Sequence, residues 1–177
     1  MRRHSARDAM GGHDTQILLE DADPLGGDAA QLQREMRAEA LRRYGDLLDG
    51  SAPPPPFEPP VPWSVFLIAR VDGQVVGCGA VWPMEAGIAE IRRMFVAAPF
   101  RRRGIARRLL VELERRAAGF GYRVLRLATG VRQPEAIALY ESFGFRRIAS
   151  YGCHVDDPVD ICFEKNVAKS ETVPSNG

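Results

Sequence analysis

Residues 94–107 read Met-Phe-Val-Ala-Ala-Pro-Phe-Arg-Arg-Arg-Gly-Ile-Ala-Arg, and this stretch decides the fold that the sequence predicts. Its first three residues are bulky and suit a half-buried strand. Pro99 interrupts regular structure, and Gly104 is typical of a turn whose backbone must come close to another group. The stretch therefore predicts the end of a strand, a tight basic turn and the start of a helix. The apolar residues after the turn take helical spacing, at Ile105, Ala106, Leu109, Leu110, Leu113 and Ala117.

The basic turn has the features of an anion site. A helix that begins on a glycine turn presents unpaired N–H groups and the positive end of its dipole, and phosphate groups commonly bind there. Arginines at positions 101, 102, 103 and 107 raise the local positive potential further. The alternative is a surface turn whose arginines only keep the helix in solution. The apolar strand before the turn and the amphipathic helix after it favour the anion site.

Length and composition exclude several classes of protein. The chain has 177 residues, which fits one domain with a sizeable core. Its 24 basic and 23 acidic residues give a net charge of +1, so no nucleic-acid or anionic-membrane partner is expected. The three cysteines lack metal-site spacing and, without a signal peptide or an apolar span, favour a cytoplasmic protein with no metal.

The rest of the chain is organised around this turn. Residues 1–13 and 167–177 are polar and are expected to be disordered or flexible. Residues 14–166 are expected to form a single domain that contains a proline-rich connector at 50–62. Hairpins early and crossovers late predict an α/β fold with a mixed sheet. The expected strands are 15–20, 65–71, 74–82, 88–96, 122–128, 145–150 and 159–164, with a turn at 83–87, and the expected helices are 28–44, 105–118 and one from Pro134 to a stop at Gly144.

Two motifs carry a resemblance to a known family. The spacing Arg101-x-x-Gly104-x-Ala106 resembles the Arg/Gln-x-x-Gly-x-Gly/Ala motif of the GNAT family of N-acetyltransferases. Residues 133–145 resemble a second signature of that family, A-x-x-L-Y-x-x-x-G-F, matched at Ala136, Leu139, Tyr140, Gly144 and Phe145. The resemblance covers roughly residues 64–165 and implies a GNAT-like, mostly antiparallel central sheet flanked by helices, with acetyl-CoA as co-substrate.

The resemblance also implies roles for individual residues. The strand residues Met94, Phe95 and Val96 would run beside the pantetheine arm of acetyl-CoA, and Gln133 could hydrogen-bond the cofactor. Tyr140 would protonate the leaving thiolate; the alternative is a core tyrosine whose hydroxyl is hydrogen-bonded. The pyrophosphate would be wrapped by the amides of Arg102, Arg103, Gly104, Ile105, Ala106 and Arg107, and Arg101 would be a further cofactor-binding residue.

The general base is less clearly marked. Some family members carry Glu at the end of the fifth strand, where this chain has Ala128. Glu90 is the better candidate, acting directly or through water, because strand alternation is expected to place it on the same face as Met94 and Val96. The alternative is that Glu90 only pairs with an arginine across the sheet, either Arg92 or Arg126. Glu85 and His154 are reserve candidates.

The sequence therefore predicts an acetyl-CoA-dependent N-acetyltransferase that works by direct attack of an amine in a ternary complex. A small-molecule amine is the expected acceptor. A protein or peptide acceptor, a non-catalytic acyl-CoA-binding module and a homodimer remain open. The helix at 28–44 and the loop at 151–158 are where acceptor specificity is expected, and their acidic residues Glu35, Glu39, Asp156 and Asp157 would suit a cationic amine.

Overall fold

The protein is described by a computed structural model that covers residues 16–47, 57–155 and 157–167. The expected disorder of residues 1–13 and of the tail after 167 lies outside the described residues, as do residues 50–56 of the proline-rich connector. The described part of the connector, residues 57–62, has no helix or strand.

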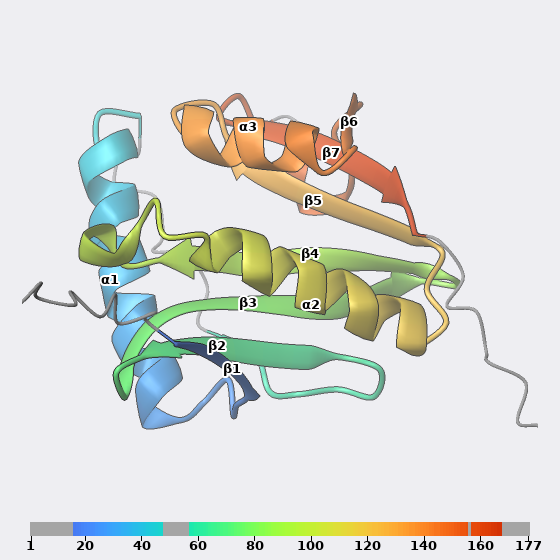
Figure 1. Ribbon diagram of the computed structural model, residues 1–177. Helices are drawn as coiled ribbons and strands as arrows, with labels where there is room; N and C mark the ends of the chain where they lie inside the picture. Colours follow the sequence, from blue (N-terminus) through green and yellow to red (C-terminus); the bar gives the residue numbers. More distant parts are fainter. Residues whose placement is uncertain (1–15, 48–56, 156, 168–177) are drawn as a thin grey trace, which may run out of the picture.

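The described residues form one seven-stranded sheet in the order β1-β2-β3-β4-β5-β7-β6 (Figure 1). Within it β4 and β5 are parallel, and the other neighbouring pairs are antiparallel. The prediction of a mixed, mostly antiparallel sheet is confirmed. The strands are β1 (Ile17–Asp21), β2 (Val65–Val71), β3 (Gln74–Glu85), β4 (Ile88–Val96), β5 (Val124–Gly130), β6 (Arg146–Ile148) and β7 (Asp160–Asn166).

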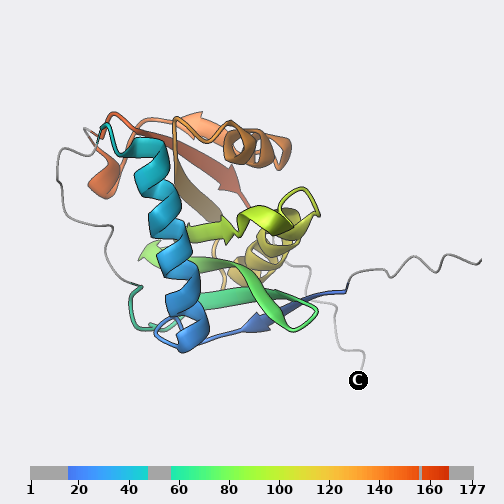
Figure 2. The same cartoon turned by 90° about the vertical axis from the view of Figure 1, so that its left-hand side faces the viewer.

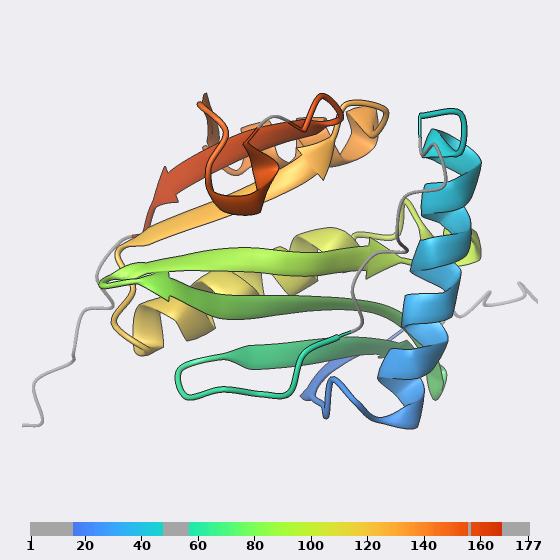
Figure 3. The ribbon, with the colours of Figure 1, turned by 180° about the vertical axis from the view of Figure 1, so that it is seen from behind.

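Helices cover both faces of the sheet. On one face, α2 (Ile105–Gly119) lies over β2, β3 and β4, and α3 (Pro134–Ser142) lies over β5 and β7 (Figure 1). On the opposite face, α1 (Gly27–Tyr44) crosses the strands near one end of the sheet (Figures 2 and 3). Two short 3₁₀ turns, η1 (Ala98–Phe100) and η2 (Gly152–His154), precede α2 and β7.

Two apolar clusters hold these layers together. The larger lies between the sheet and α2 and includes the predicted face of that helix, in which Ile105, Leu109 and Leu113 are buried. The smaller lies beneath α1, where Leu32 meets residues such as Phe66. Because both faces of the central strands are covered, β2 reads as a nearly continuous apolar run, Val65–Val71.

A β-bulge in β4 overturns one prediction. Cys78 of β3 pairs with Phe95, whereas Ala80, two residues on, pairs with Arg92, so β4 contains one extra residue. Arg93 lies at this point with a φ of 58°. The extra residue reverses the alternation, and Met94 packs towards α2 while Glu90 faces the other side of the sheet. The prediction that Glu90 shares a face with Met94 and Val96 is therefore wrong.

The parallel strands β4 and β5 pair only over residues 88–90 and 124–126. Beyond Glu90 and Arg126 they diverge, and the ends of both strands are left free to line a site. A second correction concerns β3, which continues to Glu85 through the predicted turn. Pro83 is accommodated because the register shifts between Pro83 and Glu85, where a missing N–H disturbs the ladder least.

Candidate active site

A pocket of about 530 Å³ lies between the end of β4, the basic turn, the C-terminal part of α1 and α3. Its size is in the range of pockets that hold small molecules and cofactors. Most of the predicted site residues line it, and Arg103 and Glu90 do not. The lining residues are Glu39, Arg43, Met94, Phe95, Val96, Phe100, Arg101, Arg102, Gly104, Ile105, Ala106, Arg107, Gln133, Glu135, Ala136, Leu139 and Tyr140.

The basic turn has a backbone shape suited to an anion. Arg102 and Gly104 both have positive φ angles, 63° and 78°, so the chain curls before α2 begins. The amide of Arg108 donates to the carbonyl of Gly104 at 3.0 Å. The amides before Arg108 belong to the first turn of the helix, which has no intrahelical partners for them. Such a curl followed by a helix start gathers N–H groups around an anion.

The arginines of the turn divide into two groups. The guanidinium of Arg107 lies over the ring of Phe143 at 4.7 Å, and that of Arg103 lies over Phe100 at 5.3 Å. Arg101 instead turns inward, where its Nε donates to the carbonyl of Val96 at 2.8 Å. Arg101 therefore fixes the end of β4 as well as adding positive charge to the pocket.

An ion-pair network links the turn to α1 and α3. Glu39 pairs with Arg101 and, at 2.9 Å, with Arg43, which in turn pairs with Glu135 at 2.6 Å. Burial would raise the pKa of Glu39, but the hydrogen bonds and charges of Arg101 and Arg43 outweigh it and hold that pKa below its usual value. Sequence reasoning singled out Glu39 for its charge and missed Arg43 and Glu135. The four-residue spacing of Glu39 and Arg43 on a predicted helix could have indicated that these two side chains pair.

Tyr140 projects from α3 into the pocket and is buried, with 5% of its surface exposed. Its ring packs against Phe145 at 6.0 Å and Phe163 at 6.3 Å between ring centres. Burial raises the pKa of the Tyr140 hydroxyl well above its usual value, so the hydroxyl carries its proton at neutral pH and can donate. Ala136, one helical turn earlier, lines the pocket beside it.

Gln133 is the N-cap residue of α3, directly before Pro134, and it also lines the pocket. Its Oε1 accepts a long hydrogen bond from Thr129 Oγ1 at 3.4 Å. The backbone N–H of Gln133 donates to the carbonyl of Gly130 at 3.0 Å. The first contact holds the Gln133 side chain beside Thr129, and the second fixes its backbone at the end of β5.

Glu90 is the buried carboxylate at the point where β4 and β5 separate, and only 4% of its surface is exposed. It forms an ion pair with Arg92, one of the two partners considered from the sequence. The other, Arg126, pairs with Glu164 at 2.9 Å and Glu85 at 3.2 Å. Glu90 Oε1 also accepts a hydrogen bond from the Tyr151 hydroxyl at 2.8 Å, so its charge is held from two sides.

Two kinds of feature are absent from the part of the chain that the structure describes. Over residues 16–47, 57–155 and 157–167, no group of three or more His, Cys, Asp and Glu side chains could hold a metal ion. In the same part of the chain no helix is long and apolar enough to cross a bilayer.

Comparisons with known proteins agree with this geometry. The chain is 44% identical over 101 residues to an IAA acetyltransferase of Azospirillum brasilense, an alignment that covers 56% of this chain and 66% of the relative. A Klebsiella pneumoniae crystal structure described as an acyl-CoA N-acyltransferase superposes with a TM-score of 0.69 and 29% identity, over 86% of this chain and 98% of that chain. A GNAT acetyltransferase from Elizabethkingia anophelis with acetyl-CoA bound shares the fold, with a TM-score of 0.60 and 18% identity over 85% and 97% of the two chains.

The chain spans about two thirds of the length of the first curated relatives that it matches. The family model described as the acetyltransferase (GNAT) family matches residues 33–145, which is more than half of the chain and includes both motifs. This confirms the predicted family. The chain belongs to the acetyltransferase (GNAT) family.

Proposed function

We propose that this protein transfers the acetyl group of acetyl-CoA to an amine by direct attack in a ternary complex. One observation carries the proposal: a single pocket brings the amide-rich basic turn together with the buried hydroxyl of Tyr140. The first fits a pyrophosphate, and the second can protonate a thiolate. The acetyl-CoA bound by the neighbour from Elizabethkingia anophelis supports the same use of the fold here.

In this proposal the cofactor lies along the divergent end of β4. Met94, Phe95 and Val96 offer backbone groups to the pantetheine arm. The pyrophosphate meets the amides of residues 102–107, and Gln133 contacts the arm from the start of α3. Arg103, which lies outside the pocket lining, acts through its backbone and its charge.

The proton balance assigns Tyr140 its role. The amine nitrogen attacks the thioester carbonyl carbon, the C–S bond breaks, and the departing thiolate takes the proton of the Tyr140 hydroxyl. Two protons leave the ammonium nitrogen in all: one restores Tyr140, and so ends on the CoA thiol, and the other must reach solvent. Holding both substrates in one site supplies much of the rate, and general acid catalysis adds about 10²-fold or more.

Glu90 is the base in this proposal. It lies outside the pocket lining and on the face of the sheet opposite Met94. The pairing of β4 and β5 ends at Glu90, so this carboxylate lies where the two strands separate. An acceptor entering from the α1 face, or a water beside it, can therefore pass a proton to this carboxylate. Its ion pair with Arg92 places a positive charge beside the carboxylate.

A small-molecule amine is the proposed acceptor, with a protein or peptide amine as the alternative. The C-terminal part of α1 bears on the choice, because Glu39 and Arg43 line the pocket and Tyr44 packs against Gly130 at the end of β5. This arrangement narrows the approach on the α1 face and so favours a compact acceptor over an extended peptide. The charge of Glu39 itself is already balanced by Arg101 and Arg43.

The first experiment tests the cofactor. Thermal unfolding is measured with acetyl-CoA, CoA and ATP, because a ligand that binds only the native state raises Tm. We expect acetyl-CoA and CoA to raise Tm and ATP to leave it unchanged. A folded protein whose Tm responds to none of the three would contradict the assignment of the turn.

A second experiment separates an enzyme from a binding module. CoA release is followed by thiol titration with a panel of alkylamines, amino acids, polyamines and short peptides. Tyr140→Phe should lower kcat by about 10²-fold, the lower end of the range for a general acid, while the Kd for acetyl-CoA stays within about 2-fold. Equal turnover of Tyr140→Phe and wild type would remove Tyr140 from the chemistry, and wild type that binds acetyl-CoA without any turnover would favour the module.

The proposal also covers the cellular setting, the partners and the oligomeric state of the protein. Cys78, Cys153 and Cys162 are free thiols, which supports a reducing, cytoplasmic setting. No nucleic-acid or membrane partner and no metal is proposed. A homodimer remains open and is tested by sedimentation at several concentrations.

A further inference from the structure

Glu90 is the inner end of a row of three titratable side chains that reaches the surface. His154 of η2 lies with its Nε2 3.3 Å from Glu90 Oε1. Its other ring nitrogen, Nδ1, lies 2.7 Å from Oδ2 of Asp160, which begins β7. Exposure rises along the row, from 5% of the side chain at Glu90 to 20% at His154 and 22% at Asp160. Figure 3 shows the η2 loop folded over the face of β5 and β7 opposite α3.

The hydrogen-bonding capacity of the His154 ring shows how a proton can move along this row. A neutral imidazole has one N–H and one lone pair, whereas an imidazolium has two N–H groups. With its N–H directed at Asp160, neutral His154 turns the lone pair of Nε2 towards Glu90. A proton that arrives on Glu90 can then move to Nε2, where the resulting imidazolium donates to both carboxylates.

We propose that His154, held by Asp160, relays the proton that Glu90 removes from the acceptor amine to solvent. The inference rests on the proposed function, since it takes Glu90 as the base. His154 acts through Glu90 and is a positioning and relay residue, because it touches neither substrate nor cofactor. The two loop residues that contact Glu90 are distant from it in the sequence: Tyr151 lies 61 residues after Glu90, and His154 lies 64 residues after it.

The steps balance. The ammonium proton passes to Glu90 Oε1, directly or through a water, and then to His154 Nε2. The imidazolium then gives up its Nδ1 proton to solvent at its exposed side, through Asp160 Oδ2. The neutral ring now carries its proton on Nε2, and it returns to its starting tautomer by exchanging that proton with solvent for one on Nδ1. Glu90 is ionised again and ready for the next acceptor. This is the second of the two protons that leave the amine, the one that Tyr140 does not handle.

Several other groups face this row and set its electrostatics. Tyr151 holds Glu90 through its hydroxyl and packs edge-on against the His154 ring at 5.3 Å. Burial, and then the charge of Glu90, raises the pKa of the Tyr151 hydroxyl well above its usual value, so Tyr151 serves as a fixed donor. The charged and titratable neighbours from the packed elements are Arg92 on β4, Arg126 on β5, Cys162 and Glu164 on β7, and Glu85 on β3.

One test needs no acceptor. The full chain has three histidines, His4, His13 and His154, so ¹⁵N ring signals can be assigned by the loss of one set in His154→Gln. The ring shifts are followed in wild type, Glu90→Gln and Asp160→Asn across the histidine titration range, about pH 5 to 9. The relay predicts that both variants shift the His154 titration curve. Asp72→Asn, which removes one charge in the distant β2–β3 turn, should leave it unchanged. Coincident curves in all four proteins would overturn the proposal.

A kinetic test separates proton transfer from packing. Methylamine is protonated at neutral pH and must lose a proton before attack, whereas hydroxylamine is already neutral. With His154→Gln, whose amide can still donate to Glu90 but cannot carry a proton, transfer to methylamine should fall about 10-fold or more, and transfer to hydroxylamine should stay within about 2-fold. His154→Ala should slow methylamine to a similar extent.

The outcomes distinguish the relay from the function on which it rests. Equal losses with both amines, or a fully active His154→Gln, would overturn the relay and leave His154 a packing residue. If Glu90→Gln is as active as wild type with methylamine, the base assignment fails first. If wild type binds acetyl-CoA but acetylates neither amine, the proposed function is contradicted. The histidine titration experiment does not depend on turnover, so unshifted curves would overturn the relay by themselves.

Discussion

The hydroxyl of Tyr44 accepts a hydrogen bond from the backbone N–H of Arg132 at 3.1 Å, which fixes the end of α1 to the loop after β5. The other end of α1 is tied to β2, where Asp28 pairs with Arg70 at 2.5 Å. Midway, Glu39 pairs with Arg101 beyond β4. The helix thus connects both sides of the gap between β4 and β5, and this connection can be tested.

Gly130→Ala should destabilise the protein. A Cβ at Gly130 would lie 1.9 Å from the Tyr44 hydroxyl, which must move and give up its bond to Arg132. Forced overpacking of this kind costs about 1–3 kcal/mol of unfolding free energy, measured by urea denaturation. Gly119→Ala is the matched control, because a Cβ there meets nothing within 4 Å and should change stability by less than about 1 kcal/mol. Equal effects of the two changes would argue against the contact.

Gly104→Ala should weaken both stability and acetyl-CoA binding. Its φ of 78° is unfavourable for residues with a Cβ and costs about 1–2 kcal/mol. Because Gly104 lines the pocket, relief of that strain would also move the amides of the turn. Gly121→Ala carries a similar strain, at a φ of 90°, beyond the far end of α2. We expect calorimetry to show a higher Kd for acetyl-CoA in Gly104→Ala and an unchanged Kd in Gly121→Ala. An equal loss of acetyl-CoA affinity in Gly121→Ala would contradict the assignment of the turn as the binding site.

Glu39→Gln should destabilise the protein more than a change at an exposed ion pair. Glu39 and Arg101 have side chains only 18% and 30% exposed, and removing the charge leaves Arg101 and Arg43 facing each other. Hydrogen bonds to charged groups contribute about 1.5–3 kcal/mol, so we expect a loss of about 1–2 kcal/mol. In the control Glu141→Gln, the pair with Arg147 is half exposed or more, and the loss should stay below about 1 kcal/mol.

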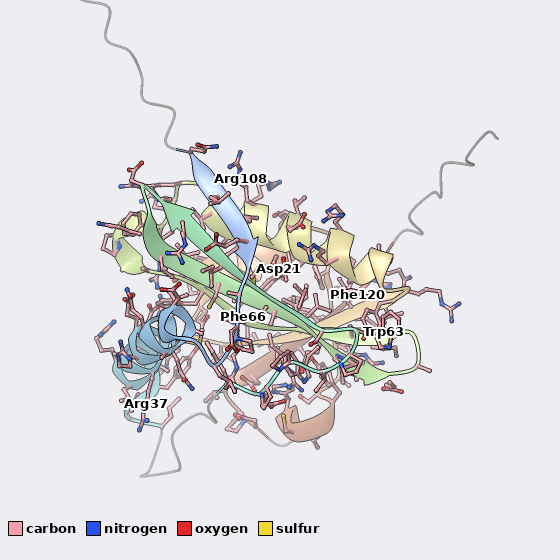
Figure 4. The ribbon with its side chains drawn as sticks, turned by 90° about the horizontal axis from the view of Figure 1, so that it is seen from below. Asp21, Arg37, Trp63, Phe66, Arg108 and Phe120 are labelled. Atoms are coloured by element: carbon pink, nitrogen blue, oxygen red, sulfur yellow. The ribbon has the colours of Figure 1, made fainter. Side chains whose placement is uncertain are left out.

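Acid should remove the stabilising contribution of Glu112. Hydrogen bonds from Arg115, and then from Arg116, lower the pKa of Glu112 to about 2 from 4.5. Arg116 also reaches Asp21 at 3.0 Å, which joins α2 to β1 where Figure 4 shows Asp21 beside the helix. A lowered carboxyl pKa stabilises the fold fully above 4.5 and progressively less as pH falls towards 2. The difference in Tm between wild type and Glu112→Gln should therefore be constant near neutral pH and shrink over that window. A difference independent of pH would contradict this account.

The local elements could be predicted because their signals are local. The segment 99–104 has Pro, Arg and Gly where a strand passes into a helix, and α2 follows with its apolar residues on one face. Glu112 and Arg116 of α2 form an ion pair at 2.8 Å, since residues four apart lie on the same side of an α-helix. Most of the predicted cofactor residues line one pocket for the same reason, because they come from two short segments that each fold as expected.

The surroundings of Glu90 could not be predicted in the same way. The sequence by itself determined the family, the order of strands and helices, the basic turn and the position of Tyr140 on its helix, because spacing of three to five residues encodes them. Only the tertiary structure decided that an extra residue at Arg93 turns Glu90 to the other face, since a bulge depends on register against β3. Only it brought His154 and Asp160 to Glu90, because contacts between residues more than sixty positions apart depend on how the η2 loop packs over the sheet.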